Sequence, residues 1–189
     1  MTKFGQLVVA FIIVGLLGAG IFWLMAGDKN VNPGGLPEFD FAQSLKNAGD
    51  GNFQPAEGSS TYENAYWGFS FNYAGDFKVS EIDEENGAFT VLAEGTGEKR
   101  TFQIFIADFE EEGPITPDRI KKDLPDIKIE QPQTISFAGT EALAFISPDE
   151  QGKMVEIWFV YGGALYQIRS YFELTDELSK ILASWQFME

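Results

Sequence analysis

The sequence predicts an α+β domain, with a largely antiparallel sheet flanked by helices, behind an N-terminal transmembrane helix. Three observations support this prediction. Residues 7–26 form an apolar run that no charged residue interrupts. Residues 66–172 contain many short segments in which apolar and polar residues alternate. After residue 64, only two segments have apolar residues at clear helical spacing. Short alternating segments joined by turn residues are typical of antiparallel sheets, and a small number of helices beside them indicates the α+β class.

The apolar run from Leu7 to Ala26 is long enough to cross a membrane. About twenty residues at 1.5 Å per residue span a hydrocarbon layer of ~30 Å. Lys3 is the only charged side chain before the run, and all 29 acidic residues follow it. Because positive residues stay in the cytoplasm, we expect residues 1–6 to be cytoplasmic and the C-terminal domain to be extracytoplasmic. A cleaved signal peptide is the alternative, although Leu24 stands where a small residue is usual.

Residues 27–63 are rich in Gly, Asn, Ser and Pro, which predicts a flexible tether between the membrane and the domain. One stretch inside it has helix signals. Asp40 to Gln43 resembles a capping box, and Gly49 is a suitable helix stop. This short helix either docks on the domain or on a partner, or it frays.

The folded domain is predicted to span residues 64–189 and to begin with four strands. Alternation places aromatic side chains on one face of the strand at 66–73, and a short strand follows at 78–83. Asn86-Gly87 is a strong hairpin signal that leads into a return strand at 88–94. Residues 100–109 then form the fourth strand.

The second half of the domain starts with a helix and ends with one. Thr116 is a good N-cap and Pro117 a good first helical residue, so we expect a short helix up to residue 124. Leucines and isoleucines at helical spacing predict a closing helix from about Thr175. The strand segments expected between the two helices lie at residues 127–129, 134–137, 141–146, 155–161 and 165–172.

Composition excludes several kinds of chemistry. The chain has no His and no Cys, so it lacks His-based triads, thiol nucleophiles and zinc–thiolate sites. The net charge of −16 argues against nucleic acid as a partner, because phosphates repel such a surface. Acidic runs at 83–85 and 110–112 lack metal-site spacing and are interpreted as solvated charge. No catalytic, cofactor-binding or metal-ligating residue is therefore predicted, and no cofactor is expected.

Three residues in the predicted sheet are candidates for contact with a partner: Trp158, Tyr171 and Arg169. The two aromatic side chains would line a groove, or they would simply pack under a helix. Arg169 would bind a ligand, or it would pair with a neighbouring acidic side chain.

The stretch from Tyr66 to Tyr73, followed by Asp76-Phe77, resembles the opening strand of PsbP-like domains. The ending from Ile181 to Phe187 is similar to their closing helix and tail. Trp67, Ala74 and Trp185 depart from the usual pattern. The resemblance covers about residues 62–189 and implies an α/β/α sandwich that is used for binding rather than for chemistry. The family includes photosystem II extrinsic subunits, a nuclear import factor and bacterial envelope proteins.

Together these observations predict a single-pass, membrane-anchored, extracytoplasmic binding or accessory module of the cell envelope that is not an enzyme. Its partners would be the membrane, through residues 7–26, and an envelope protein. Two alternatives are a carboxylate-based, cation-dependent hydrolase and a structural envelope spacer. The hydrolase requires acidic residues that are distant in sequence to meet in one pocket. The spacer predicts a surface without an exposed aromatic patch.

Overall fold

The computed structural model describes residues 39–50, 58–84, 87–111, 113–150 and 152–188. They belong to one unit that starts at Phe39. The helices are α1 (Phe41–Asp50), α2 (Pro117–Asp123) and α3 (Thr175–Ala183), with a 3₁₀ turn at Phe172–Leu174. The strands are β1 (Ser59–Asn64), β2 (Phe69–Ala74), β3 (Lys78–Asp83), β4 (Phe89–Glu94), β5 (Thr101–Asp108), β6 (Glu130–Phe137), β7 (Thr140–Asp149), β8 (Gly152–Tyr161), β9 (Ala164–Tyr171) and β10 (Gln186–Phe187).

The predicted cytoplasmic residues 1–6 and the predicted transmembrane helix at 7–26 lie outside the described residues. Of the helices that the structure describes, none combines the length and the apolar character that a bilayer crossing requires.

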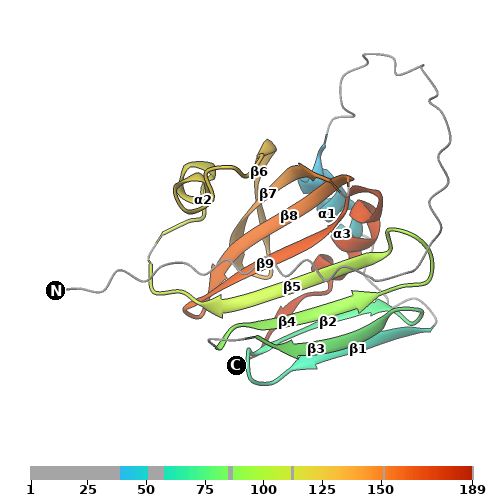
Figure 1. The fold of residues 1–189 in the computed structure, drawn as a ribbon. Coiled ribbons are helices and arrows are strands. Elements are labelled where there is room, and N and C mark those ends of the chain that lie inside the picture. Colours follow the sequence, from blue (N-terminus) through green and yellow to red (C-terminus); the bar gives the residue numbers. More distant parts are fainter. Residues whose placement is uncertain (1–38, 51–57, 85–86, 112, 151, 189) are drawn as a thin grey trace, which may run out of the picture. The chain divides into compact units, whose positions relative to one another are not determined.

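The strands form two antiparallel sheets (Figure 1). The larger sheet has seven strands in the order β3-β4-β5-β9-β8-β7-β6, and the smaller has three in the order β1-β2-β10. The α+β class and the antiparallel pairing are confirmed. The prediction of one sheet is incomplete, because β2 does not continue into the sheet that β3 enters. A tight turn separates them, in which the Phe77 amide donates to the Ala74 carbonyl at 3.0 Å.

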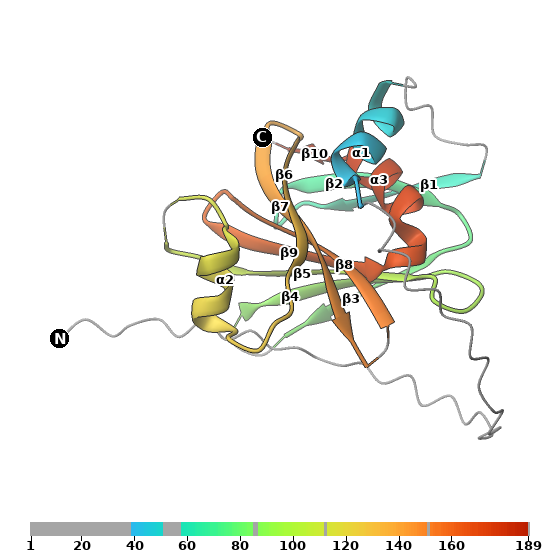
Figure 2. The same cartoon turned by 90° about the horizontal axis from the view of Figure 1, so that it is seen from above.

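The main core lies between one face of the large sheet and a layer made of α1, α3 and the small sheet (Figures 1 and 2). Alternating residues of β4 and β5 face this core, as the sequence predicts, and Ile104 and Ile106 are fully buried there. Trp185 enters from the end of α3 and stacks on Phe69, with 4.6 Å between the ring centroids. The aromatic residues of the opening strand and of the C-terminal tail therefore meet in the same core.

The opposite face of the large sheet carries α2, which begins as predicted. The Arg119 amide donates to the hydroxyl of the N-cap residue Thr116. Ile120 packs from α2 onto Phe145 and Trp158 of the sheet in a second, smaller cluster. Helices thus cover both faces of the large sheet.

Helix α1 docks on the domain through its first turn, so the docking alternative is confirmed. Asp40 caps the helix, because its carboxylate accepts from the Gln43 amide at 2.8 Å. Phe41 is fully buried beside α3 and the edge strand β6. A bulge between Glu130 and Gln133 interrupts the β6 register, and the Gln133 side chain accepts from the Phe41 amide at 3.1 Å.

The predicted tether at residues 27–63 needs a correction, because α1 and β1 both lie within it. β1 pairs with β2 along its whole length, and Tyr62 from β1 is buried against the core. Gly75 allows this arrangement, since a Cβ atom there would stand 2.0 Å from the Gly58 carbonyl oxygen. The folded unit therefore begins before residue 64 and includes the described residues back to Phe39.

Candidate functional site

One end of the sandwich brings together segments that are far apart in sequence. The β1–β2 turn, the β8–β9 turn and strand β10 lie there, at the left-hand end of the view in Figure 1. The Met188 amide donates to the Gly68 carbonyl at 2.8 Å, which joins the C-terminal strand to the β1–β2 turn. The Tyr161 ring, at the end of β8, stacks on Phe187 with 3.5 Å between centroids. We name the four aromatic residues at this end, Tyr66, Trp67, Tyr161 and Phe187, the aromatic rim.

The aromatic rim exposes large rings to solvent. Tyr66 is 88% exposed and Tyr161 is 40% exposed, and in the described part of the chain these are the large hydrophobic residues that count as exposed. Trp67 and Phe187 are half-buried and pack against the core. Tyr66 meets Trp67 edge to face at 5.2 Å. The rim is therefore continuous with the core on its inner side and open to solvent on its outer side.

The β1–β2 turn that displays Tyr66 is held by a buried side chain. Asn64 is 7% exposed, and its carboxamide oxygen accepts from the Trp67 amide at 2.9 Å. Its amide nitrogen donates to the Tyr62 hydroxyl at 3.0 Å, and that hydroxyl donates to Glu81 at 2.7 Å. This network links the small sheet to the edge of the large sheet. The exposed ring is thus carried on an ordered turn with satisfied backbone groups.

Tyr166 supports the aromatic rim from below. It is almost completely buried and stacks on Phe159 at 4.8 Å. Its hydroxyl donates to the Trp67 carbonyl at 3.1 Å, which fixes the rim to β9. Burial raises the pKa of Tyr166 to about 12, so the hydroxyl is a neutral donor at physiological pH.

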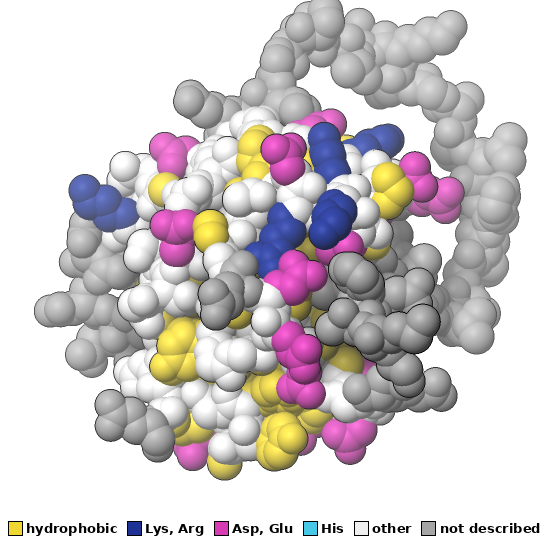
Figure 3. Space-filling model, turned by 90° about the vertical axis from the view of Figure 1, so that its left-hand side faces the viewer, with side chains coloured by type: hydrophobic (Ala, Val, Ile, Leu, Met, Phe, Trp, Pro, Cys, Tyr) yellow, Lys and Arg dark blue, Asp and Glu magenta, His cyan; other side chains and the backbone are white. Residues whose placement is uncertain are grey.

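Two exposed carboxylates flank the aromatic rim. Asp108 on β5 and Tyr161 on β8 both pair in register with Ala164 on β9, the strand between them. The two side chains therefore lie on the same face of the sheet, on opposite sides of Ala164. Asp83 pairs with Phe89 at the same end of the neighbouring strands. Within the described residues, no ion pair includes either carboxylate. Figure 3 shows hydrophobic and acidic side chains side by side over the lower half of this end.

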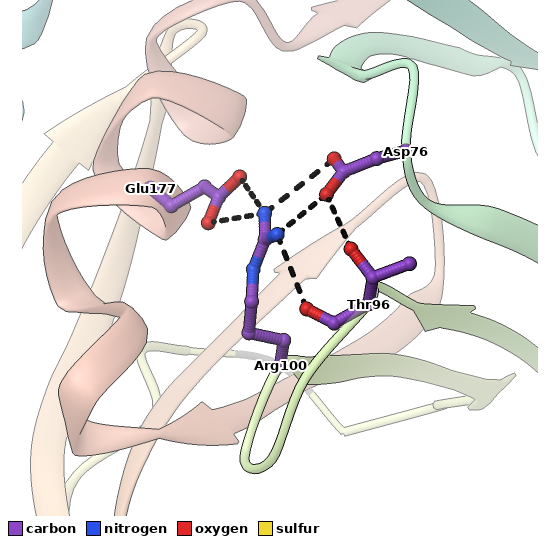
Figure 4. Close-up of polar contacts among 4 residues, drawn as sticks. All are labelled: Asp76, Thr96, Arg100 and Glu177. Atoms are coloured by element: carbon purple, nitrogen blue, oxygen red, sulfur yellow. Dashed lines mark hydrogen bonds and ion pairs between the residues drawn. The ribbon is translucent and has the colours of Figure 1, made fainter.

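The opposite end of the sandwich is closed by ion pairs (Figure 4). Arg100, in the β4–β5 hairpin, bonds both carboxylate oxygens of Glu177 on α3, at 2.9 and 3.2 Å, and also bonds Asp76. Lys99 pairs with Glu173 at 2.6 Å. The hydrogen bond from Arg100 holds the pKa of Asp76 below its usual value. The charges here connect the β4–β5 hairpin to α3, to the 3₁₀ turn and to the turn that carries Asp76.

The three residues that the sequence suggests for partner contact do not form one exposed surface. Trp158 is 2% exposed beneath α2, so it packs under a helix rather than lining a groove. Arg169 is half-buried and pairs with Asp149 and with Glu156. Tyr171 is half-buried on the same face of the sheet. For Trp158 and Arg169 the structural alternatives are the correct ones.

Glu156 is a buried carboxyl group beside these residues. It is 2% exposed, accepts from the Trp158 indole at 3.2 Å, and lies 3.4 Å from Arg169. Burial raises the pKa of Glu156 to about 7, although the charge of Arg169 and the bond from Trp158 both act to lower it. One carboxylate oxygen of Glu156 makes no hydrogen bond. The group therefore carries a proton in part of the molecules at neutral pH.

The acidic runs do not converge. In the part of the chain that the structure describes, no group of three or more Asp or Glu side chains is arranged to hold a metal ion. Glu84 accepts a hydrogen bond from Thr90, and Glu111 pairs with Arg119 of α2. Glu85 and Glu112 lie outside the described residues.

The aromatic rim was not identified from the sequence as a unit. Alternation predicts Trp67 on the same strand face as Phe69 and Phe71, but Trp67 lies in the turn before β2. The usable signal is the position of the two tyrosines near turn glycines. Tyr161 stands directly before Gly162-Gly163, and Tyr66 stands two residues before Gly68. The sequence alone does not show that the β1–β2 turn of the small sheet lies next to the β8–β9 turn of the large sheet.

A scan against protein-family models finds no match, and a search of curated protein sequences finds none either. Among solved structures, the chain is similar to the cyanobacterial PsbP protein CyanoP from Synechocystis, with a TM-score of 0.50 and 12% identity. The match covers 69% of this chain and 92% of that one. A protein from Bacteroides thetaiotaomicron also matches, with a TM-score of 0.42 and 12% identity over 68% of this chain and 48% of that one. The folded unit of this chain therefore has a PsbP-like fold, on the match to CyanoP, as the resemblance of its opening strand and closing tail predicted.

Proposed function

We propose that this protein is a non-catalytic accessory module that binds another protein of the cell envelope through the aromatic rim. The observation that carries the proposal is the exposure of Tyr66 on a turn that Asn64 orders. Exposed aromatic rings that lie together mark interaction sites, and Tyr and Trp are enriched where partners bind. An envelope spacer needs no such surface, so the rim favours binding over a purely structural role.

We further propose that residues 7–26 anchor the chain in the membrane, with the folded unit on the extracytoplasmic side. The support is the length and apolar character of this run, together with the acidic residues that follow it. The test is fractionation followed by protease treatment of intact cells stripped of outer layers. The full chain should sediment with membranes and be degraded from outside. Recovery in the soluble fraction, or protection from protease, would contradict the proposal.

Binding at the aromatic rim is tested in cells by site-specific photo-crosslinking. A photoreactive amino acid replaces Tyr66 in the full chain, and the matched control replaces Glu98, which is exposed in the β4–β5 hairpin at the ion-paired end. We expect one discrete adduct band from position 66 and none from position 98. Equal adducts from both positions, or none from position 66, would rule out the rim as the contact surface.

A further inference from the structure

We infer that the aromatic rim, together with Asp83 and Asp108, binds a partner segment that carries exposed arginine or lysine side chains. This inference rests on the proposed function and specifies the chemistry of the partner at the same surface.

The exposed rings present faces that a cation can cover. Tyr66 touches Trp67 edge to face, and Tyr161 stacks one of its faces on Phe187. Tyr66 remains 88% exposed and Tyr161 40% exposed. A guanidinium or ammonium group within about 6 Å of such a face is attracted by the ring quadrupole. The described part of the chain already contains such contacts, with Arg100 over Phe77 at 4.9 Å and Arg119 over Phe109 at 4.7 Å.

The carboxylates beside the rim are available, in contrast to those at the other end. Asp76, Glu173 and Glu177 are occupied by Arg100 and Lys99. Asp83 and Asp108 are exposed, and within the described residues no cation pairs with them. The whole chain has a net charge of −16, so its field draws basic groups and repels acidic ones. Charge complementarity therefore selects a basic segment over an acidic or a purely apolar one.

The surface is also ordered before any partner arrives. Asn64 holds the turn that carries Tyr66, Tyr166 holds the Trp67 carbonyl, and the backbone of Gly68 is bonded to Met188. A surface that does not need to be rearranged loses less conformational entropy on binding. A small number of solvent-exposed contacts with a partner segment can then produce measurable affinity.

The test uses the full chain, labelled with ¹⁵N and solubilised in a neutral detergent, and follows amide shifts during peptide titration. The probe is a blocked peptide with four arginines separated by glycines. The matched probes replace each arginine by glutamine or by glutamate. We expect saturable shifts with the arginine peptide, concentrated at residues 66–68, 108–109 and 161–163, and none with the other two.

Conservative variants separate ring, charge and fold. Tyr66→Phe keeps the ring face and should change the dissociation constant less than twofold. Tyr66→Leu keeps apolar area but removes the ring, and should weaken binding about two- to fivefold. The double variant Asp83→Asn and Asp108→Asn should weaken binding about fivefold at low salt and flatten its dependence on salt. Glu98→Gln, at the ion-paired end, is the matched control and should change nothing.

Each other result contradicts the inference. Shifts spread evenly over acidic surface, equal binding of the glutamine peptide, or equal affinities of Tyr66→Leu and the wild type would show that no cation site exists at the rim. If position 66 still gives a specific adduct in cells, the proposed function stands and only the partner chemistry is wrong. If position 66 gives no adduct while the arginine peptide binds as expected, the cation site exists and the proposed function fails.

Discussion

Glu156 determines how the stability of this protein responds to pH near neutrality. Its pKa is about 7 in the folded chain against 4.5 for an ordinary glutamate, because burial disfavours the charged form. A carboxyl group with a raised pKa stabilises the folded state fully below pH ~4.5, and this contribution is lost as the pH rises to about 7. The free energy of unfolding should therefore fall by about 3 kcal/mol over this window.

Glu156→Gln removes the titrating group and keeps the size of the side chain. We expect its free energy of unfolding, measured with urea at a series of pH values, to be nearly constant between pH 5 and 7. Asp76 and Glu173 have lowered pKa values, so their contributions are lost at more acidic pH and do not overlap with this window. Glu150→Gln, on the exposed β7–β8 turn, is the control. Parallel pH profiles of wild type and Glu156→Gln would disprove the assignment.

Asn64 is the residue on which the order of the aromatic rim depends. Asn64→Ala leaves the Trp67 amide without its partner and removes the donor to the Tyr62 hydroxyl, which keeps its bond to Glu81. Unsatisfied buried polar groups cost about 1–3 kcal/mol, so the melting temperature should drop and amide exchange in residues 65–68 should accelerate. Asn72→Ala is the matched control, since the Asn72 side chain bonds only the exposed Thr61 hydroxyl among the described residues. A similar loss in both variants would assign no special role to Asn64.

Single residues differ in how far the sequence determines their role. Ile104 and Ile106 were predicted correctly, because alternation along a strand decides which side faces the core. Trp158 obeys the same alternation but faces the second cluster beneath α2, and the sequence does not show which face a helix covers. The buried pairing of Glu156 with Arg169 follows from the β8–β9 register, which is a property of the folded sheet.

At the scale of elements, α3 is attached to the β4–β5 hairpin mainly through Arg100 (Figure 4). Glu177→Gln keeps the shape of the side chain but removes the negative charge of the carboxylate, whose two oxygens both accept from Arg100. We expect a loss of about 1 kcal/mol, which 1 M NaCl should reduce, and faster amide exchange in the first turn of α3. Lys180→Gln, exposed on the same helix, serves as the control. An undisturbed α3 in Glu177→Gln would mean that apolar packing alone holds the helix.

Elements with strong local signals were predicted well. Thr116-Pro117 defined the start of α2, and the hairpin around Gly87 and the turn at Gly162-Gly163 were both expected. β1 was missed because its sequence, SSTYEN, is polar and only Tyr62 and Asn64 point inward. The polar composition of these residues predicted a tether. They form a strand instead, because they pair with β2 and because Tyr62 packs against the core.

At the scale of the whole molecule, the two ends of the sandwich have opposite character. At one end, Arg100 and Lys99 pair with Glu177 and Glu173. The other end exposes aromatic rings next to Asp83 and Asp108, which form no ion pair with another residue that the structure describes. The fold class and the PsbP-like architecture followed from sequence pattern and motif. The division into two sheets and the contrast between the ends did not, because both depend on contacts between residues that are distant in sequence, such as Arg100 and Glu177, or Tyr166 and Trp67.

The extent of the folded unit gives a direct test of the whole architecture. A chain of residues 64–189 matches the boundary expected from the sequence, and a chain of residues 39–189 matches the unit that the structure defines. The shorter chain lacks four buried side chains, namely Phe39, Phe41, Leu45 and Tyr62. Burying each contributes roughly 1.5–3 kcal/mol, and their sum approaches the 5–15 kcal/mol that holds a typical domain together.

We therefore expect residues 39–189 to unfold in one cooperative transition with dispersed amide resonances. Residues 64–189 should bind a hydrophobic dye and lose near-ultraviolet circular dichroism, because Phe69 and Phe71 lose the ring of Tyr62 that packs 5.8 and 5.2 Å from them. Residues 58–189 keep β1 but lack α1, so their stability should fall between the two. If residues 64–189 melted at the same temperature as residues 39–189, α1 and β1 would be appendages, and the core as drawn here would be wrong.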